Sequence, residues 1–241
     1  MALREQLVEE SNWSSLSQTT TALRIVAGSG VAIPQPYPRD GESPLWQRIA
    51  KRTIDLAGAS VLLVLLAPLL FVLCIAIRID SPGPAMFRQR RLGRDGRPFR
   101  ILKLRTLSVI EDGSAIRQVT KNDPRVTRLG RILRRFSIDE LPQLVNVVRG
   151  DMSLVGPRPH ALAHDRDYAA LIPEYTLRQS VRPGITGWAQ IHGCRGETAT
   201  PEEMRRRVRL DLWYLAHAGL RLDLGILFAT PRVVLFGRNA W

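Results

Sequence analysis

The sequence predicts an α+β protein in which an N-terminal re-entrant membrane helix precedes a small mixed domain with short strands. Three observations support this fold class. An uncharged apolar run extends from Leu56 to Ile77, strand-like alternation occupies residues 97–104, and apolar residues at helical spacing occur in residues 128–148. A chain of 241 residues with 45% hydrophobic content is sufficient for one large domain or two small ones.

Residues 1–45 are rich in Ser and Thr and then in Pro, a composition typical of a flexible extension. A short strand is expected around Leu23 to Val26. The segment lacks an apolar stretch after a basic start, so it is not predicted to be a signal peptide.

Residues 46–80 are predicted to form a membrane anchor. As a helix the uncharged run would be ~33 Å long, enough to cross a bilayer. Pro68 interrupts the run and should kink it. Basic residues flank both ends, and positive flanks favour the cytoplasmic side. A helix that enters, bends and returns is therefore expected, with a full span and a buried core helix as the alternatives.

Residues 81–241 are predicted to form one domain that follows the anchor, and the resemblance described below implies that it is the catalytic domain. After a Pro-rich turn, two short strands at residues 85–87 and 97–104 should flank a turn at residues 94–96. Lys103 and Arg105 alternate with apolar residues on the second strand, which gives either a binding face or simply a solvated one.

The second half of this domain is predicted to be mainly helical. Expected helices cover residues 128–135 and 160–180 and begin again at Pro201, and a loop at residues 181–193 leads into a short strand. The segment 222–236 would lie amphipathically in the membrane interface, broken at Pro231, or would pack against the anchor or core.

The net charge of +13 comes almost entirely from arginine, because the chain has only three lysines. Arginine carries a rigid fork of donors that suits phosphate groups. Anionic partners are therefore expected, and charge alone leaves nucleic acid, anionic lipid and a phosphorylated substrate open. The two cysteines, Cys74 and Cys194, do not indicate a disulfide framework.

An acidic pair, Asp139 and Glu140, lies between Arg134 and Arg135 on one side and the later Arg149 and Arg158 on the other. The apolar spacing that follows places the carboxylates at the start of a helix, where arginines and backbone N–H groups suit a metal-bound phosphate. A structural alternative is a capping box, since Ser137 precedes Glu140 by three residues.

His160 and His164 are separated by one helical turn, but no third ligand is close in the sequence, so a zinc site is not favoured.

A series of motifs, in this order and spacing, resembles the bacterial sugar transferases, the monotopic polyprenyl-phosphate phosphoglycosyl transferases. The resemblance runs from Lys51 to the C-terminus. It rests on Ser81-Pro82-Gly83-Pro84, Lys103-x-Arg105-Thr106, Asn122-Asp123-Pro124-Arg125, Ser137-Ile138-Asp139-Glu140-Leu141-Pro142-Gln143, Gly150 to Pro159 and Pro183 to Gln190. The segment Gly193-x-Arg195-Gly196-Glu197-Thr198 is most similar to the undecaprenyl-phosphate glucose phosphotransferase branch.

The resemblance implies a two-step transfer with Mg²⁺ at the acidic pair. Asp139 would attack the β-phosphate of a UDP-sugar, with glucose the first expectation, and undecaprenyl phosphate would then take up the phosphosugar. Glu140 would hold the metal with Asp139 or assist the acceptor. Structural prolines are expected at Pro68, Pro157 and Pro159, and the expected phosphate-binding residues are Arg134, Arg158, Lys103, Arg105, Arg182 and Arg195.

The same resemblance implies a place at the cytoplasmic face of the bacterial inner membrane, in contact with lipid, and a role in starting exopolysaccharide or other glycan synthesis. A homodimer stays open, and nucleic acid is not an expected partner. The competing hypotheses are a membrane-tethered nucleic-acid-binding module and a catalytically inactive scaffold.

Overall fold

The computed structural model describes residues 24–25, 32–33, 44–108, 123–196, 198 and 200–236. The chain divides into two units, residues 1–38 and 39–241. In the first unit, β1 (Arg24–Ile25) pairs with β2 (Ala32–Ile33) in antiparallel fashion. The short strand expected around residues 23–26 is therefore present; the rest of the predicted flexible extension lies outside the described residues.

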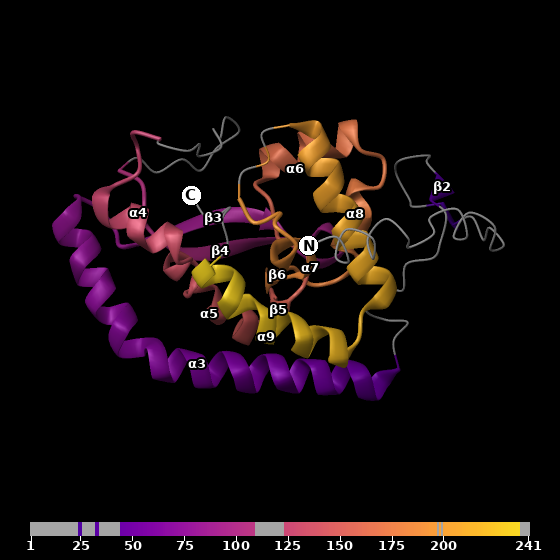
Figure 1. Ribbon diagram of the computed structural model, residues 1–241, viewed down its shortest axis with the longest axis horizontal. Helices are drawn as coiled ribbons and strands as arrows, with labels where there is room; N and C mark the ends of the chain where they lie inside the picture. The colour runs from indigo at the N-terminus through magenta and orange to yellow at the C-terminus, as the bar shows by residue number, and fades with distance from the viewer. Residues whose placement is uncertain are drawn as a thin grey trace. The chain divides into compact units, whose positions relative to one another are not determined.

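The second unit begins with α3 (Leu45–Asp80), which covers the predicted anchor. It is the one helix, in the part of the chain that the structure describes, that is long and apolar enough to cross a membrane. Figure 1 shows that α3 is bent along its length, as expected for a helix containing Pro68. Its apolar window is almost entirely exposed, so the buried core helix is not supported. The re-entrant path stays a prediction.

A β-hairpin follows α3. Strand β3 (Met86–Leu92) pairs in antiparallel register with β4 (Pro98–Leu104) across the 3₁₀ turn η1 (Arg94–Gly96). The first strand is longer than expected, and the second begins one residue later. Alternate residues of the hairpin point to opposite faces, so Phe87, Gln89 and Arg91 share one face with Lys103 of the facing strand.

Helix α4 (Arg128–Arg135) has the predicted bounds. The Thr127 hydroxyl caps it by accepting from the N–H of Gly130. A Cβ on Gly130 would lie 2.3 Å from the Thr106 carbonyl oxygen, so this close approach of helix and strand end requires glycine. A small core joins the end of α3 to β4 and α4; it contains Ile77, Ala85, Leu104 and Leu133.

The segment after α4 differs from the predicted capping box. Ser137 adopts a left-handed conformation (φ 51°) and makes no capping hydrogen bond, and η2 (Ile138–Glu140) is a single 3₁₀ turn. Helix α5 (Gln143–Arg149) begins only after Pro142. The capping-box interpretation is wrong because the Glu140 carboxylate is bound by cations from other elements, as described below.

The rest of the unit contains β5 (Ser153–Val155), parallel to β6 (Gly184–Thr186), and the helices α6 (Leu162–Leu171), η3 (Tyr175–Ser180), α7 (Trp188–Ile191), α8 (Pro201–His217) and α9 (Leu220–Phe236). Mixed helix and strand confirm the α+β class.

Several sequence predictions for this half need correction. The single helix expected at residues 160–180 is divided by Pro173 into α6 and η3, and the loop at 181–193 holds both β6 and α7. No strand follows residue 193 among the described residues. Helix α8 does start at Pro201, with a capping box between Thr200 and Glu203. Pro231 lies within α9 and does not end it.

Helix α3 is attached to the rest of its unit near both ends. Figure 1 shows it along one side, with α5 and α9 next to it. Near the start, the Asp55 carboxylate accepts from the Ser153 hydroxyl (2.8 Å) and the Leu154 N–H (2.9 Å). Near the end, Ile77 packs in the small core described above.

Candidate active site

The acidic pair lies on η2, between α4 and α5. Asp139 and Glu140 are each only 7% exposed. Ser137 makes the tight turn that leaves α4, and Pro142 starts α5, so the pair is held on one short turn. Two carboxylates on such a turn require compensation, since burial disfavours their charged forms.

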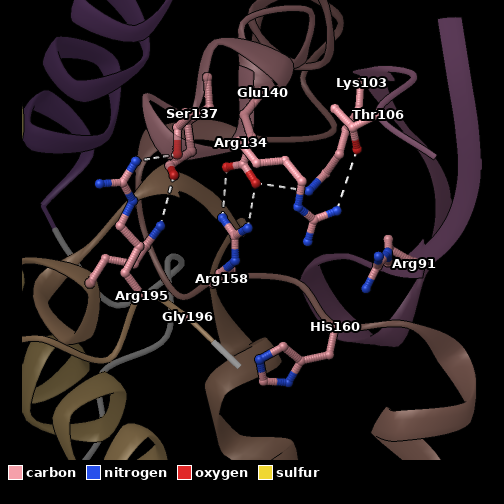
Figure 2. A network of polar contacts seen from close by, with 12 residues as sticks. Arg91, Lys103, Thr106, Arg134, Ser137, Glu140, Arg158, His160, Arg195 and Gly196 are labelled. Atoms are coloured by element: carbon pink, nitrogen blue, oxygen red, sulfur yellow. Dashed lines mark hydrogen bonds and ion pairs between the residues drawn. The ribbon is translucent and has the colours of Figure 1, made fainter. Parts of the chain in front are cut away.

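Glu140 receives that compensation from two cations. Arg158 grips both of its oxygens, with Nη1 2.7 Å from Oε2 and Nη2 on Oε1, and the Lys103 Nζ lies 2.8 Å from Oε1. Figure 2 shows this fork at the centre of the cluster. Burial by itself would raise the pKa of Glu140, but Arg158 and Lys103 hold that pKa well below its usual range. Glu140 is therefore a fixed anion.

Asp139 has no hydrogen bond within the described part of the chain, although it neighbours the same cations. Burial, followed by the charge of Glu140, raises the pKa of Asp139 to about 6. Its carboxylate is therefore ionised near neutral pH but is not occupied by a fixed partner. The two neighbours on one turn thus differ in their environments.

Further cations surround the pair. The Arg134 Nη1 lies 3.4 Å from the Thr106 hydroxyl, and Arg195 donates to the Ser137 hydroxyl. Burial lowers the pKa of Arg134, of Arg195 and of Lys103. Together with Arg158, the predicted residues Lys103, Arg134 and Arg195 form one cluster with the acidic pair. Cations outnumber carboxylates in it, which favours binding of a multiply charged anion.

Two predicted phosphate-binding residues lie elsewhere. Arg105 donates to the carbonyl oxygens of Ile77 (3.2 Å), Ser81 (2.6 Å) and Pro82, so it closes the C-terminal end of α3. The Arg182 Nε donates to the Gly150 carbonyl oxygen at 3.0 Å. The structure does not bring either guanidinium into the cluster, because both are used by backbone carbonyls.

The predicted structural prolines lie on either side of Arg158 and inside α3. The Pro157 carbonyl oxygen accepts from the Gly184 N–H at 2.9 Å, which ties the Arg158 loop to β6. Pro159 leads from Arg158 to His160. This arrangement is consistent with a rigid loop that presents Arg158.

A buried network behind Arg158 was missed in the sequence. Arg178 donates to the Arg158 carbonyl oxygen (2.7 Å) and to Asp211, while Arg207 contacts His160 (3.2 Å) and the Gly196 carbonyl oxygen (2.6 Å). These residues come from separate elements, so no local spacing could have revealed them. Burial keeps the pKa of His160 well below its usual range. His160 thus packs among arginines, and the described residues contain no group of three or more metal ligands.

The acidic pair fits a divalent cation only in part. Mg²⁺ commonly uses one or two carboxylates and completes its shell with phosphate oxygens and water. Asp139 could supply such a ligand together with a substrate diphosphate. Both oxygens of Glu140 are already bound by cations, so Glu140 fits the expected ligand role less well than Asp139.

Comparison with known proteins gives one family and several relatives. The family model described as "Bacterial sugar transferase" matches residues 46–237. Over 193 residues the chain is 54% identical to the UDP-glucose:undecaprenyl-phosphate glucose-1-phosphate transferase of Caulobacter vibrioides, covering 80% of this chain and 72% of that protein.

Two further relatives are longer. A protein of the same name from Escherichia coli is 50% identical over 183 residues, covering 76% of this chain and 39% of that protein. The UDP-N-acetylgalactosamine-undecaprenyl-phosphate N-acetylgalactosaminephosphotransferase of Aeromonas hydrophila is 39% identical over 198 residues, covering 82% and 46%. The match thus spans most of the first relative but less than half of these two.

Proposed function

Because the chain belongs to the bacterial sugar transferase family, we propose that it transfers a sugar 1-phosphate from a UDP-sugar to undecaprenyl phosphate. The family and the enzyme class expected from the motifs, a polyprenyl-phosphate phosphoglycosyl transferase, are confirmed by these comparisons. Glucose is the first choice of sugar, since the Caulobacter and Escherichia relatives are named for UDP-glucose. The product would begin an exopolysaccharide or another lipid-linked glycan.

The proposal depends on the contrast within the acidic pair. Asp139 is buried and ionisable near neutral pH without a fixed partner in the described structure, whereas Glu140 is gripped by Arg158 and Lys103. A nucleophile must be able to approach phosphorus, and a carboxylate held by three charged contacts is poorly suited to do so. The geometry therefore favours Asp139 as the nucleophile and Glu140 as the anchor of the surrounding cations.

The proposed reaction has two displacements at one phosphorus. An Asp139 oxygen forms a bond to the β-phosphorus of the UDP-sugar, the bond to the bridging oxygen breaks, and UMP leaves with the electron pair. An oxygen of undecaprenyl phosphate then attacks the same phosphorus, and Asp139 departs as a carboxylate. Arg134, Arg158 and Arg195 lie where they can offset charge on the transferring phosphoryl group. A Mg²⁺ ion, if bound by Asp139 and the diphosphate, would neutralise phosphate charge.

A covalent trap tests this assignment. Enzyme incubated with UDP-glucose and without acceptor should gain one phosphohexose on Asp139, detected by peptide mass spectrometry, and should release UMP. Asp139→Asn should show neither, while its melting temperature in detergent micelles stays at least that of the parent. Glu140→Gln is the matched neighbour and should still form some adduct. Adduct on any other residue would exclude Asp139 as the nucleophile, and binding of DNA without UMP release would favour the nucleic-acid alternative.

We propose that α3 enters the cytoplasmic face of the inner membrane and returns to it. Both ends of α3 contact one folded unit, through Asp55 with Ser153 at one end and Ile77 with Leu104 at the other. A single unit cannot lie on both sides of a bilayer. The exposed apolar residues between these ends, among them Val61, Val64, Leu65 and Phe71, would then face lipid.

The topology can be checked with single cysteines in a variant lacking Cys74 and Cys194. Leu45→Cys and Pro84→Cys place thiols at exposed positions just beyond each end of the apolar run. Both should react with an impermeant reagent from the cytoplasmic side. Labelling from opposite sides would convert the anchor to a full span.

A further inference from the structure

Arg91 was not among the residues singled out from the sequence, yet it lies beside the acidic-pair cluster. It is on the face of β3 that also carries Gln89 and, on the facing strand, Lys103. Its backbone also forms an isolated bridge with Ala161, just after the loop that presents Arg158. Figure 2 shows the Arg91 side chain at the right edge of the network, below Thr106 and above His160.

The Arg91 guanidinium has few partners for its charge. It donates to the side-chain oxygen of Gln89, but its Nε is shielded from solvent and has no partner among the residues that the structure describes. No ion pair of Arg91 occurs in that same set. Burial, and then repulsion by Arg158, lowers the pKa of Arg91 to about 10.

The neighbouring carboxylates, Asp165 and Glu140, raise the pKa of Arg91, but neither forms an ion pair with it in the described structure. Glu140 is already bound by Arg158 and Lys103. One oxygen of Asp165 accepts from the Tyr175 hydroxyl at 2.7 Å, and its other oxygen is buried without a partner. A half-buried guanidinium without a direct carboxylate partner is unfavourable in the free protein, because Asp165 and Glu140 offset its desolvation cost only in part.

We propose that Arg91 binds a phosphate group of the substrates, and that the ligand supplies the anionic partner that the free protein lacks. The planar fork of arginine suits phosphate oxygens, and the Arg91 guanidinium adds a further cation beside Arg158. Which phosphate is bound rests on the proposed function: the diphosphate of the UDP-sugar and the phosphate of the polyprenyl acceptor offer the same chemistry.

A structural role makes the opposite stability prediction. If Arg91 served to pair with Asp165 and hold β3 to α6, its removal would destabilise the protein. If Arg91 instead binds an anionic ligand, its removal eliminates a charge that has no ion-pair partner in the ligand-free protein, and stability should not fall. Arg91→Gln should therefore leave the melting temperature of the ligand-free protein unchanged or raise it, while binding of the anion weakens.

The first experiment measures binding of inorganic diphosphate by calorimetry to the full chain in detergent micelles. Arg91→Gln should weaken this binding by about 10- to 100-fold, the range expected for hydrogen bonds to a charged group. Arg90→Gln is the matched control, because it removes the same charge from an exposed position on the opposite face of the same strand. Three outcomes would overturn the proposal: diphosphate binding of equal strength by Arg91→Gln and the parent, no diphosphate binding by the parent, or a melting temperature of Arg91→Gln below that of the parent.

Steady-state kinetics then assign the phosphate. A rise in KM confined to the UDP-sugar places Arg91 on the donor diphosphate, and a rise confined to undecaprenyl phosphate places it on the acceptor. Arg91→Lys, which keeps the charge but not the fork, should recover part of the loss. If the parent releases no UMP from any UDP-sugar, the proposed reaction fails while the diphosphate measurement still decides the role of Arg91.

Discussion

Two regions of the second unit contain buried charged residues, and the two regions differ in whether protein groups neutralise those charges. At the α3 joint, defined by Lys51, Arg52 and Asp55, each charge has a partner: Lys51 pairs with Asp223 (2.6 Å), Arg52 donates to the carbonyl oxygens of Val147 (2.8 Å) and Val148 (3.0 Å), and Asp55 accepts from Ser153 and Leu154. At the acidic-pair cluster, cations exceed carboxylates and Asp139 has no fixed partner in the described chain.

The comparison shows how a site differs from a joint in the same fold. Charges that are matched by protein groups hold elements together and require nothing further. Charges in excess, on a rigid frame that cannot neutralise them, require a ligand. Substitutions at the joint should therefore change stability and spare turnover, whereas substitutions in the cluster should change turnover and need not reduce stability.

The largest effect is expected from Arg158, which both pairs with Glu140 and is proposed to bind the transferring phosphate. Arg158→Met removes the fork on Glu140 and leaves that carboxylate with Lys103 alone. We expect a loss of about 3–5 kcal/mol in stability, as for removal of one partner of a buried pair, and a fall in UMP release of about 10²–10³-fold. Thermal melting and UMP release measure the two effects separately.

The control for this prediction is the double variant Arg158→Met, Glu140→Gln. Without the Glu140 charge, much of the lost stability should return, but UMP release should stay low because the phosphate-binding guanidinium is absent. Recovery of turnover along with stability would mean that Arg158 acts only as a structural partner of Glu140.

Asp139 should destabilise the folded protein at neutral pH. Its folded pKa of about 6 is above its unfolded value of 3.8, so the folded state holds a proton more tightly. The free energy of unfolding contributed by this group therefore decreases as pH rises from about 4 to 6 and stays lower above that range. Asp139→Asn should raise stability by roughly 1–3 kcal/mol at pH 7–8, and the gain should shrink toward pH 4.

Turnover should increase as pH rises, whereas the stability contribution of Asp139 decreases, because the nucleophile is the ionised carboxylate. The rate of UMP release should rise with pH through about 6 and then level off. Glu140, whose folded pKa is held well below its usual value of 4.5, should contribute stability that is fully present above about pH 4.5 and is lost progressively as the pH falls below that value. A rate that increases as pH falls below 6 would be inconsistent with an ionised Asp139.

A substitution at the α3 joint should change stability without changing turnover, in contrast to the substitutions in the cluster. Asp55→Asn keeps the shape but loses charge and one acceptor for Ser153 or Leu154, groups that are buried with it. We expect a loss of about 1–3 kcal/mol in stability, with UMP release per folded molecule unchanged. Ser153→Ala, which removes only the hydroxyl, should cost less. A turnover defect at full stability would show that the joint communicates with the site.

Much of this distinction could be predicted from the sequence, but not all of it. Local patterns gave α4, the hairpin and the start of α8, since periodicity and capping act within a few residues. The motifs indicated Lys103, Arg134, Arg158 and Arg195, which the structure brings together around the acidic pair, and their phosphate-binding role stays a prediction. They could not place Arg105, because its role depends on the carbonyl groups at the end of α3, more than 20 positions earlier in the chain.

The capping box failed for a similar reason. Ser137 and Glu140 have the right spacing, but spacing does not reveal that Arg158 and Lys103 approach from a distant loop and strand and bind Glu140 more strongly than a backbone N–H would. Arg91 was overlooked because one arginine in a basic strand has no distinguishing pattern. Its significance comes from what surrounds it, which only the tertiary structure shows.

The smallest effect is expected from the loss of a single hydrogen bond at the α3 joint. The Tyr214 hydroxyl donates to Asp223 Oδ1 at 2.7 Å, while Oδ2 of the same carboxylate binds Lys51. Tyr214→Phe should cost about 0.5–1.5 kcal/mol in thermal melting, because Lys51 still neutralises Asp223. Tyr168→Phe, which loses a bond of 3.2 Å to the Thr198 carbonyl oxygen away from the joint, is the control. If UMP release per folded molecule fell in Tyr214→Phe alone, the division between a structural joint and a ligand-requiring cluster would have to be abandoned.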